Sequence, residues 1–216
     1  MAAETHCPLC GSENGISAYF EDARRPYVMC GCCGLVFVPP AWHLDREAER
    51  AEYLLHENDP GDEGYRQFLS RLAEPLLERL PPGASGLDFG CGEGPALAAM
   101  LRECGLTVAL YDSFFVPDES VFSERYDFIT ATEVVEHLHQ PGAELARLWR
   151  MLRHGGYLAL MTKLVRDREA FAGWHYKNDP THVCFFSRET FTWWGAQYDV
   201  RPEFIGADVI LLRRPD

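Results

Sequence analysis

The chain has 216 residues, of which 47% are hydrophobic and 25% charged, and its formal net charge is −13. This length allows one ordinary domain with a small appendage, and the composition is typical of a soluble globular protein. The acidic balance argues against a protein whose main task is to grip nucleic acid, because binding phosphates needs clustered Lys and Arg. No apolar run approaches the length of a membrane span, and the first residues do not resemble a signal peptide. We therefore expect a cytoplasmic setting and no membrane partner.

Two C-x-x-C knuckles frame the first part of the chain. They supply four thiols: Cys7, Cys10, Cys30 and Cys33. In a reducing setting such pairs bind metal more often than they form disulfides, and four sulfurs suit a closed, structural Zn²⁺ site. Between and after the knuckles, "ISAYF", "PYVMC" and "LVFVPP" read as short strands. The pattern predicts a zinc ribbon over residues 1–40, with His6 or Cys32 as less favoured substitute ligands.

Residues 41–82 are predicted to form a helical linker or lid. Residues 44–58 have apolar positions at helical spacing, and "DPGDEG" ends this helix. A second helix is expected over 65–80, where Pro75 indicates a kink or a restart. The linker offers three outer candidates for a site in the next domain: Tyr53, His56 and Tyr65.

From residue 83 onward the pattern alternates between strand and helix. This alternation predicts an α/β domain over 83–216, with a Rossmann-like, mostly parallel sheet. The expected strands are 85–90, 107–112, 126–133, 157–162, 199–206 and 207–214. The expected helices are 94–105, 142–156 (ended by paired glycines) and 187–198. The last two strands are expected to form a C-terminal antiparallel hairpin.

A glycine-rich turn, "LDFGCGEG" at 87–94, joins the first of these strands to a helix. Gly90 and Gly92 let the backbone approach a ligand closely. The spacing matches neither the dinucleotide nor the P-loop pattern, and Asp88 would repel a pyrophosphate. Asp112 ends the next strand, where a carboxylate can hold a ribose hydroxyl. An adenosine with a positive charge in place of phosphate fits these features, which describes S-adenosyl-L-methionine.

Four stretches taken in order resemble the successive motifs of class I S-adenosylmethionine-dependent methyltransferases. They are "LDFGCGEG", the acidic end of "TVALYD", "YDFITATEVVEHL" and "LRHGGYLALMT", and the resemblance covers about residues 65–216. It implies an enzyme of this class that binds S-adenosyl-L-methionine. The implied cofactor-binding residues are Tyr65, Asp88, Phe89, Gly90, Cys91, Gly92, Asp112, Ser113, Phe114, Thr132 and Glu133.

Within this resemblance, Asp112 should hold the ribose, Phe114 should pack near the adenine, and Thr132 or Glu133 should lie beside the sulfonium. Cys91 is interpreted as a small filler of the turn, not a nucleophile. The chain departs from the family at residues 113–125, where a helix and a strand are usual. We therefore expect a loop on the adenine side.

Two stretches offer acceptor-site groups: "EVVEHL" and the loop "WHYKNDPTHVCFFS". Methyl transfer is an in-line displacement that often requires removal of a proton from the acceptor. Neutral imidazole accepts a proton near pH 7, so His182 or His175 is the favoured general base. For His137 we keep two roles open, one in acid–base chemistry and one in the structure. For Glu133 we likewise keep a catalytic role and a cofactor contact open. Ordinary surface histidines in a polar loop are the alternative.

A second metal site is a further possibility. Glu133, Glu136, His137 and His182 resemble the two Glu and two His that bind a divalent metal in small-RNA 2′-O-methyltransferases. Mixed carboxylate and imidazole ligands suit Mg²⁺, Mn²⁺ or Fe²⁺ and leave positions open for acceptor oxygens.

The leading hypothesis is a methyltransferase that acts on a small-molecule acceptor at oxygen, with nitrogen, sulfur and carbon open. One alternative is an RNA-modifying 2′-O-type enzyme, and another is a non-catalytic module that binds S-adenosylmethionine. The sequence indicates neither the acceptor nor the oligomeric state nor the role of the ribbon.

Overall fold

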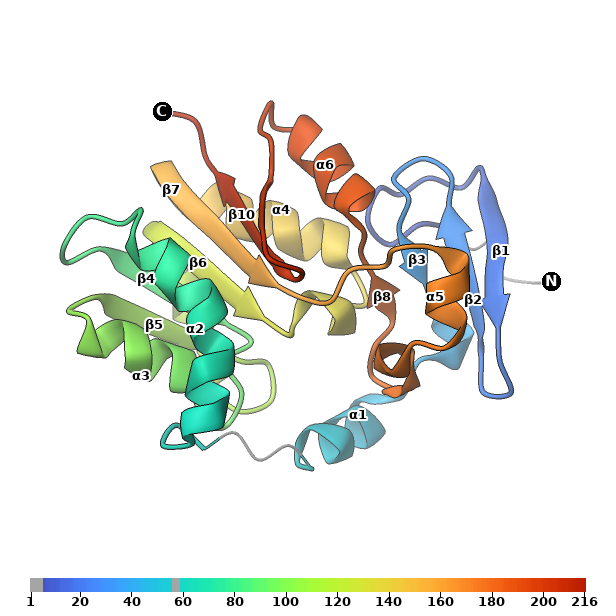
Figure 1. Cartoon of the computed structure of the whole chain (residues 1–216), viewed down its shortest axis with the longest axis horizontal. Helices are drawn as coiled ribbons and strands as arrows, with labels where there is room; N and C mark the ends of the chain where they lie inside the picture. Colours follow the sequence, from blue (N-terminus) through green and yellow to red (C-terminus); the bar gives the residue numbers. More distant parts are fainter. Residues whose placement is uncertain (1–5, 56–58) are drawn as a thin grey trace.

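Two β-sheets organise the molecule, for which a computed structural model describes residues 6–55 and 59–216. The larger sheet has the order β5-β4-β6-β7-β10-β9, and the smaller has the order β1-β2-β3-β8. Figure 1 shows the larger sheet with its helices on the left and the small sheet on the right, with the N-terminus at the far edge of the small sheet. No helix within the described ranges is long and apolar enough to cross a membrane.

The larger sheet is Rossmann-like and mostly parallel, as predicted. Strands β4, β5, β6 and β7 run parallel to one another, whereas β10 is antiparallel to both β7 and β9. The C-terminal hairpin is therefore confirmed, with β9 at the sheet edge. The bounds are β4 Ser85–Phe89, β5 Thr107–Tyr111, β6 Tyr126–Thr132, β7 Leu152–Met161, β9 Glu203–Ile205 and β10 Val209–Arg213.

Helices cover both faces of this sheet, because successive strand residues point to opposite sides. In β7, Leu158 and Leu160 belong to the buried cluster that holds α4 and α6. Ala159 and Met161 belong instead to the cluster that holds α2 and α3. The helices are α2 Glu63–Leu77, α3 Ala96–Glu103, α4 Pro141–Met151 and α6 Arg188–Ala196.

One predicted helix end is wrong. The sequence indicated a helix that runs to the paired glycines, but α4 ends at Met151 and β7 continues through both of them. Gly155 has a φ of 75°, and the pairing of β6 with β7 shifts register near this point. A Cβ on Gly156 would lie 2.8 Å from the carbonyl oxygen of Asp127. The glycines therefore serve an irregular, close strand pairing and do not end a helix.

The connection between β5 and β6 is a loop, and the structure describes every residue of it. It contains only the 3₁₀ helix η2, Glu119–Ser123, and an isolated bridge between Asp112 and Val116. Strand β5 is therefore an edge of the sheet. The expected departure on this side is confirmed.

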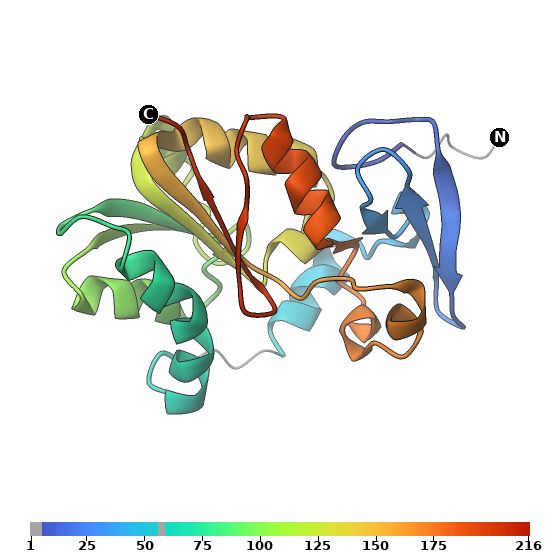
Figure 2. The same cartoon turned by 45° about the horizontal axis from the view of Figure 1, so that its top comes forward.

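The N-terminal lobe contains the three predicted strands: β1 Ile16–Glu21, β2 Pro26–Cys30 and β3 Val36–Phe37. A fourth strand, β8 (Cys184–Phe185), comes from late in the chain and pairs antiparallel with β3. One buried cluster contains Cys7 and Tyr27 together with Leu87 of β4. Figure 2 shows the neighbouring helix α5 (Arg168–Ala172, orange) beside the blue strands of this lobe. The division into 1–40, 41–82 and 83–216 stays a prediction, but this sheet crosses its first boundary.

Short helices occupy the remaining connections. They are η1 Pro40–Trp42, α1 Arg46–Tyr53, η3 Val135–His137, α5 Arg168–Ala172 and η4 His175–Asn178. Asp45 caps the N-terminus of helix α1, and its carboxylate accepts from the Glu47 and Ala48 amides. His56, one of the outer candidates, lies outside the described residues.

Candidate active site

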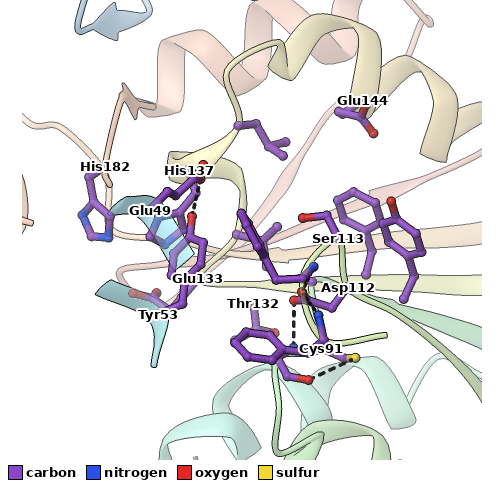
Figure 3. Close-up of a pocket in the computed structure, with 18 of the residues that line it drawn as sticks. Glu49, Tyr53, Cys91, Asp112, Ser113, Thr132, Glu133, His137, Glu144 and His182 are labelled. Carbon is purple, nitrogen blue, oxygen red and sulfur yellow. Dashed lines mark hydrogen bonds between the residues drawn. The ribbon is translucent and has the colours of Figure 1, made fainter. Parts of the chain in front are cut away.

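A cavity of about 800 Å³ opens at the carboxyl ends of β4, β5 and β6. Parallel strands end at the same edge of a sheet, so the loops that follow them meet there. Helix α1 and the loop before β8 add further walls. In Figure 3, Asp112, Ser113 and Cys91 lie on one side of this space, and His137 and His182 lie on the other.

The glycine turn lies close to its neighbours, as its sequence indicated. The Gly90 and Cys91 amides both donate to the carbonyl oxygen of Tyr111, at 2.7 and 3.1 Å. Gly90 has a φ of 73°, and a Cβ there would lie 2.5 Å from a methyl carbon of Val134. Both the conformation and the close approach therefore require glycine at this position.

Asp112 follows β5, and three backbone amides hold its carboxylate at the cavity wall. One oxygen accepts from Phe114 and Phe115 at 2.8 and 3.1 Å, and the other accepts from Gly92 at 3.1 Å. A carboxylate offers about four acceptor positions. Asp112 therefore keeps acceptor capacity for a ligand hydroxyl.

Asp88 occupies a different place from the one expected. It is absent from the cavity lining, and only 4% of its surface is exposed. Thr130 donates to its carboxylate at 2.7 Å from the neighbouring strand. Burial raises the pKa of Asp88 to about 6, although the bond from Thr130 acts in the opposite direction. The carboxyl therefore lies behind the glycine turn.

The other expected cofactor residues all line the cavity: Tyr65, Phe89, Gly90, Cys91, Gly92, Asp112, Ser113, Phe114, Thr132 and Glu133. Among the described residues, Thr132 Oγ1 and Glu133 Oε1 are buried and have no hydrogen-bond partner. Buried polar atoms are normally satisfied, so these two atoms await a ligand or water. A nucleoside with a positively charged group fits this donor set.

Two buried glutamates share one tyrosine at the deep end of the cavity. The Tyr176 hydroxyl hydrogen-bonds to Glu136 and lies 3.2 Å from Glu133 Oε2. Burial raises the pKa of Glu133 to about 7, and burial together with the charge of Glu133 raises the pKa of Glu136 to about 8. The Tyr176 hydroxyl has one proton and can donate to only one of the two carboxyls at a time. Because both pKa values are raised, the two glutamates can share a proton near neutral pH.

Two histidines meet beside this pair. The rings of His137 and His182 are 4.6 Å apart at an interplanar angle of 72°. His182 Nδ1 lies 2.7 Å from the carbonyl oxygen of Tyr176. A carbonyl oxygen can only accept, so Nδ1 is the donor of this hydrogen bond. Its Nε2 lies 3.7 Å from a carboxylate oxygen of Asp179. The ring is thus oriented from one side, with a carboxylate near the other nitrogen.

The structure separates the four proposed catalytic residues. Glu133, His137 and His182 line the cavity. His175 is exposed, lies outside the lining, and has its Nε2 3.0 Å from Lys163 Nζ. The loop before β8 therefore presents one of its two histidines to the cavity.

The four knuckle cysteines have the geometry of a zinc site. Their Sγ atoms all lie within 4.8 Å of one another, with separations of 3.5 Å for Cys7 to Cys33 and 3.6 Å for Cys10 to Cys30. Tetrahedral Zn–S bonds of about 2.3 Å place sulfurs about 3.8 Å apart, so the four thiols fit zinc. Cys32 is exposed and outside the cluster.

The proposed second metal site is brought together in part. Ligand atoms of Glu136, His137 and His182 lie within 4.8 Å of one another. Glu133 is not in this group, although it contacts the same tyrosine as Glu136. Three of the four residues therefore fit a divalent metal, and the hydrogen bond from Tyr176 competes for one of them.

Helix α1 contributes Tyr53, one of the outer candidates, and Arg46, which the sequence did not single out. Arg46 donates to the carbonyl oxygen of Ser113 at 2.8 Å, and its guanidinium lies 4.4 Å from the Phe114 ring centre. The ring centre of Tyr53 lies 5.4 Å from that of Phe114 and 5.3 Å from that of His137. The helix thus contacts the cavity wall at Ser113 and Phe114 and also at His137. The polar, helical pattern of the linker predicted a lid, but it did not indicate which residues the lid contacts.

Comparisons with known proteins indicate a methyltransferase. A methyltransferase domain model matches residues 61–202, and the chain belongs to this family. It is similar to the ribosomal protein L11 methyltransferase of Cupriavidus taiwanensis, with 28% identity over 166 residues, 64% of this chain and 54% of that protein. The counterpart from Burkholderia vietnamiensis is 37% identical over 73 residues, 32% of this chain and 23% of that protein. The chain spans about half the length, or less, of these curated relatives.

A solved structure has the same fold over almost the whole chain. It is the 1,6-didemethyltoxoflavin-N1-methyltransferase of Burkholderia thailandensis, determined with 1,6-didemethyltoxoflavin and S-adenosylhomocysteine bound. The TM-score is 0.55 at 17% identity, with 93% of this chain and 100% of that chain covered.

Proposed function

We propose that this protein is an S-adenosylmethionine-dependent methyltransferase that acts on a small-molecule acceptor at oxygen. One observation carries the proposal: the cavity that contains the Asp112 carboxylate also contains His137 and His182. A group that can hold a ribose and a group that can take a proton thus face the same enclosed space. The fold neighbour, an N1-methyltransferase that was solved with S-adenosylhomocysteine and a small acceptor, supports the small-molecule acceptor but not the choice of oxygen.

The cofactor end is built by residues that bind and orient. Asp112 accepts a hydrogen bond from the ribose, and the turn at Gly90 and Gly92 lets the ligand lie against the backbone. Thr132 and Glu133 would offer their unsatisfied oxygens to the positively charged group of the cofactor. When bound, the cofactor supplies a methyl group on positively charged sulfur.

The acceptor end is built to take a proton. His182 Nε2 would accept the proton of the acceptor hydroxyl, which leaves that oxygen free to attack. The bond from Nδ1 to the Tyr176 carbonyl fixes the tautomer, and Asp179 stabilises the imidazolium that forms. Tyr53 shields this end from water.

A metal-assisted variant has one observation in its favour, the close grouping of Glu136, His137 and His182. A divalent ion there would lower the pKa of an acceptor hydroxyl, and His182 would be a ligand and not the base. Metal analysis of the purified chain distinguishes the two. A second divalent ion, lost in Glu136→Gln while zinc remains, supports the metal-assisted variant.

Calorimetric titration with S-adenosylhomocysteine tests the cofactor site. Asp112→Ala should weaken binding by about 100-fold, because it removes an acceptor held by three amides. Asp118→Ala, an exposed aspartate in the same loop, should bind as the wild type does. Absence of binding by the wild type would overturn the proposal.

Methyl-labelled cofactor incubated with fractionated cell extract tests the acceptor class. We expect label in the small-molecule fraction. Label in RNA or in protein would contradict the small-molecule acceptor while leaving the methyltransferase in place.

A further inference from the structure

Arg25, in the turn that joins β1 to β2, is a buried arginine with an unusual set of partners. Only 6% of its surface is exposed. Its guanidinium donates to four main-chain carbonyls of one loop: Lys177 (3.0 Å), Asp179 (2.7 Å), Pro180 (2.8 Å) and His182 (2.9 Å). Its Nε donates to the Tyr27 hydroxyl at 3.2 Å. The guanidinium thus spans the loop that brings His182 to the cavity.

The same turn holds this loop at further points. Lys177, itself only 5% exposed, forms an ion pair with Asp22 at 2.8 Å. Tyr27 donates to the Lys177 carbonyl at 3.2 Å. Beyond His182, the Val38 amide donates to the Val183 carbonyl at 2.9 Å, and β8 then joins the lobe's sheet.

A loop in this position needs such a partner. Residues 177–182 contain only the end of η4, so few of their carbonyls are satisfied by regular structure. A buried carbonyl without a donor costs about as much as a lost hydrogen bond. The planar guanidinium supplies several donors in a fixed fork, which a lysine ammonium cannot reproduce.

We propose that Arg25 is a positioning residue for methyl transfer: through the carbonyls of residues 177–182 it holds the His182 imidazole at the acceptor end of the cavity. This inference rests on the proposed function and gives the cysteine-bearing lobe a role in it. The lobe acts as the support of the acceptor loop, whereas the cofactor end is built from β4, β5 and the turns after them.

This separation makes the role testable without a known acceptor. Loosening of the acceptor loop should leave the glycine turn and Asp112 as they are, because their hydrogen bonds come from Tyr111, Gly92 and the 114–115 amides. If Arg25 only stabilised the fold as a whole, its removal would instead speed amide exchange at both ends of the cavity together.

Hydrogen–deuterium exchange and calorimetry on the full chain with its zinc test the proposal. Arg25→Ala should make exchange of residues 176–183 at least about tenfold faster, while peptides from 85–92 and 107–115 and the affinity for S-adenosylhomocysteine stay within about twofold. Added methylguanidinium should restore the slow exchange, since it refills the site that the side chain left. Arg24→Ala is the matched control, because Arg24 is half-exposed and reaches the same loop only at Asn178.

Each outcome decides the matter. Unchanged exchange of 176–183 in Arg25→Ala overturns the proposal, as does equal loosening of both ends or an Arg24→Ala effect of the same size. If Arg25→Ala does not fold, Arg25→Lys is measured by the same criteria, with partial loosening of 176–183 alone as the expected result. Failure of the wild type to bind S-adenosylhomocysteine would count against the proposed function and would leave the exchange result to stand by itself.

Discussion

Asp88 shows how burial at one residue sets a pH dependence for the whole fold. Its pKa is about 6 in the folded protein and about 4 in an unfolded chain, because burial disfavours the charged form. The stability that it contributes is therefore complete below about pH 4 and is lost as pH rises through 6. The loss amounts to about 3 kcal/mol.

Asp88→Asn should remove this loss, since the amide oxygen can still accept from Thr130. We expect the free energy of unfolding of the variant, relative to wild type, to rise between pH 4 and pH 6 and to level off above it. Urea denaturation of both proteins at a series of pH values measures this difference in the free energy of unfolding. A difference that stays flat across this interval would show that the carboxyl is not the buried group we describe.

His182 carries the proposed proton transfer. His182→Ala should lower the turnover of methyl transfer by about 10²- to 10⁴-fold, with the cofactor affinity unchanged. The assay follows labelled methyl into the acceptor fraction. His175→Ala, on the same loop but outside the cavity, should change turnover less than about twofold. Equal losses in both variants would contradict the assignment of the base.

Helix α4 shows what the elements add to the residues. The first cysteine knuckle lies directly against its first turn, where the Gly142 amide donates to the Pro8 carbonyl at 3.1 Å. A Cβ on Gly142 would lie 2.2 Å from the Leu9 carbonyl oxygen. The knuckle therefore packs on the backbone of a helix from the larger sheet, and this glycine permits the contact.

Gly142→Ala should destabilise the protein by about 1–3 kcal/mol, although alanine is the better helix former. The clash is with backbone, so the knuckle must move. Chemical denaturation gives the change, and Gly173→Ala is the control, since a Cβ there has no atom within 4 Å. A neutral or stabilising Gly142→Ala would mean that the knuckle does not pack on α4 in this way.

For the molecule as a whole, the cysteine-bearing lobe and the α/β body share a sheet and a core. If zinc binds the four cysteines, as their spacing predicts, its removal should therefore do more than unfold the lobe. On release of about one zinc per chain to a chelator, we expect exchange to rise in 6–40 and also in 176–185, whereas α3 and β4 stay protected. If 176–185 keeps its protection in the zinc-free chain, the lobe does not support the acceptor loop.

Much of this architecture was predictable because it depends on local patterns. The knuckle spacing indicated that the four cysteines come together, and the alternation of strand and helix indicated the mostly parallel sheet. The glycine turn followed by Asp112 marked residues that line one cavity. Each of these signals is a short motif or a regular pattern that can be recognised without knowledge of the tertiary contacts. The short connection at 113–125 likewise indicated the loop that leaves β5 at the edge.

What the tertiary structure decided depends on contacts between distant parts of the chain. Arg25 and its carbonyl partners lie about 150 residues apart, and β8 joins a sheet whose other strands come before residue 40. Residue type and spacing do not encode such pairings, because burial and hydrogen-bond partners arise only when the whole chain packs. For the same reason sequence alone placed Asp88 at the ligand and treated His175 and His182 alike, whereas packing put Asp88 behind the turn and one histidine in the cavity.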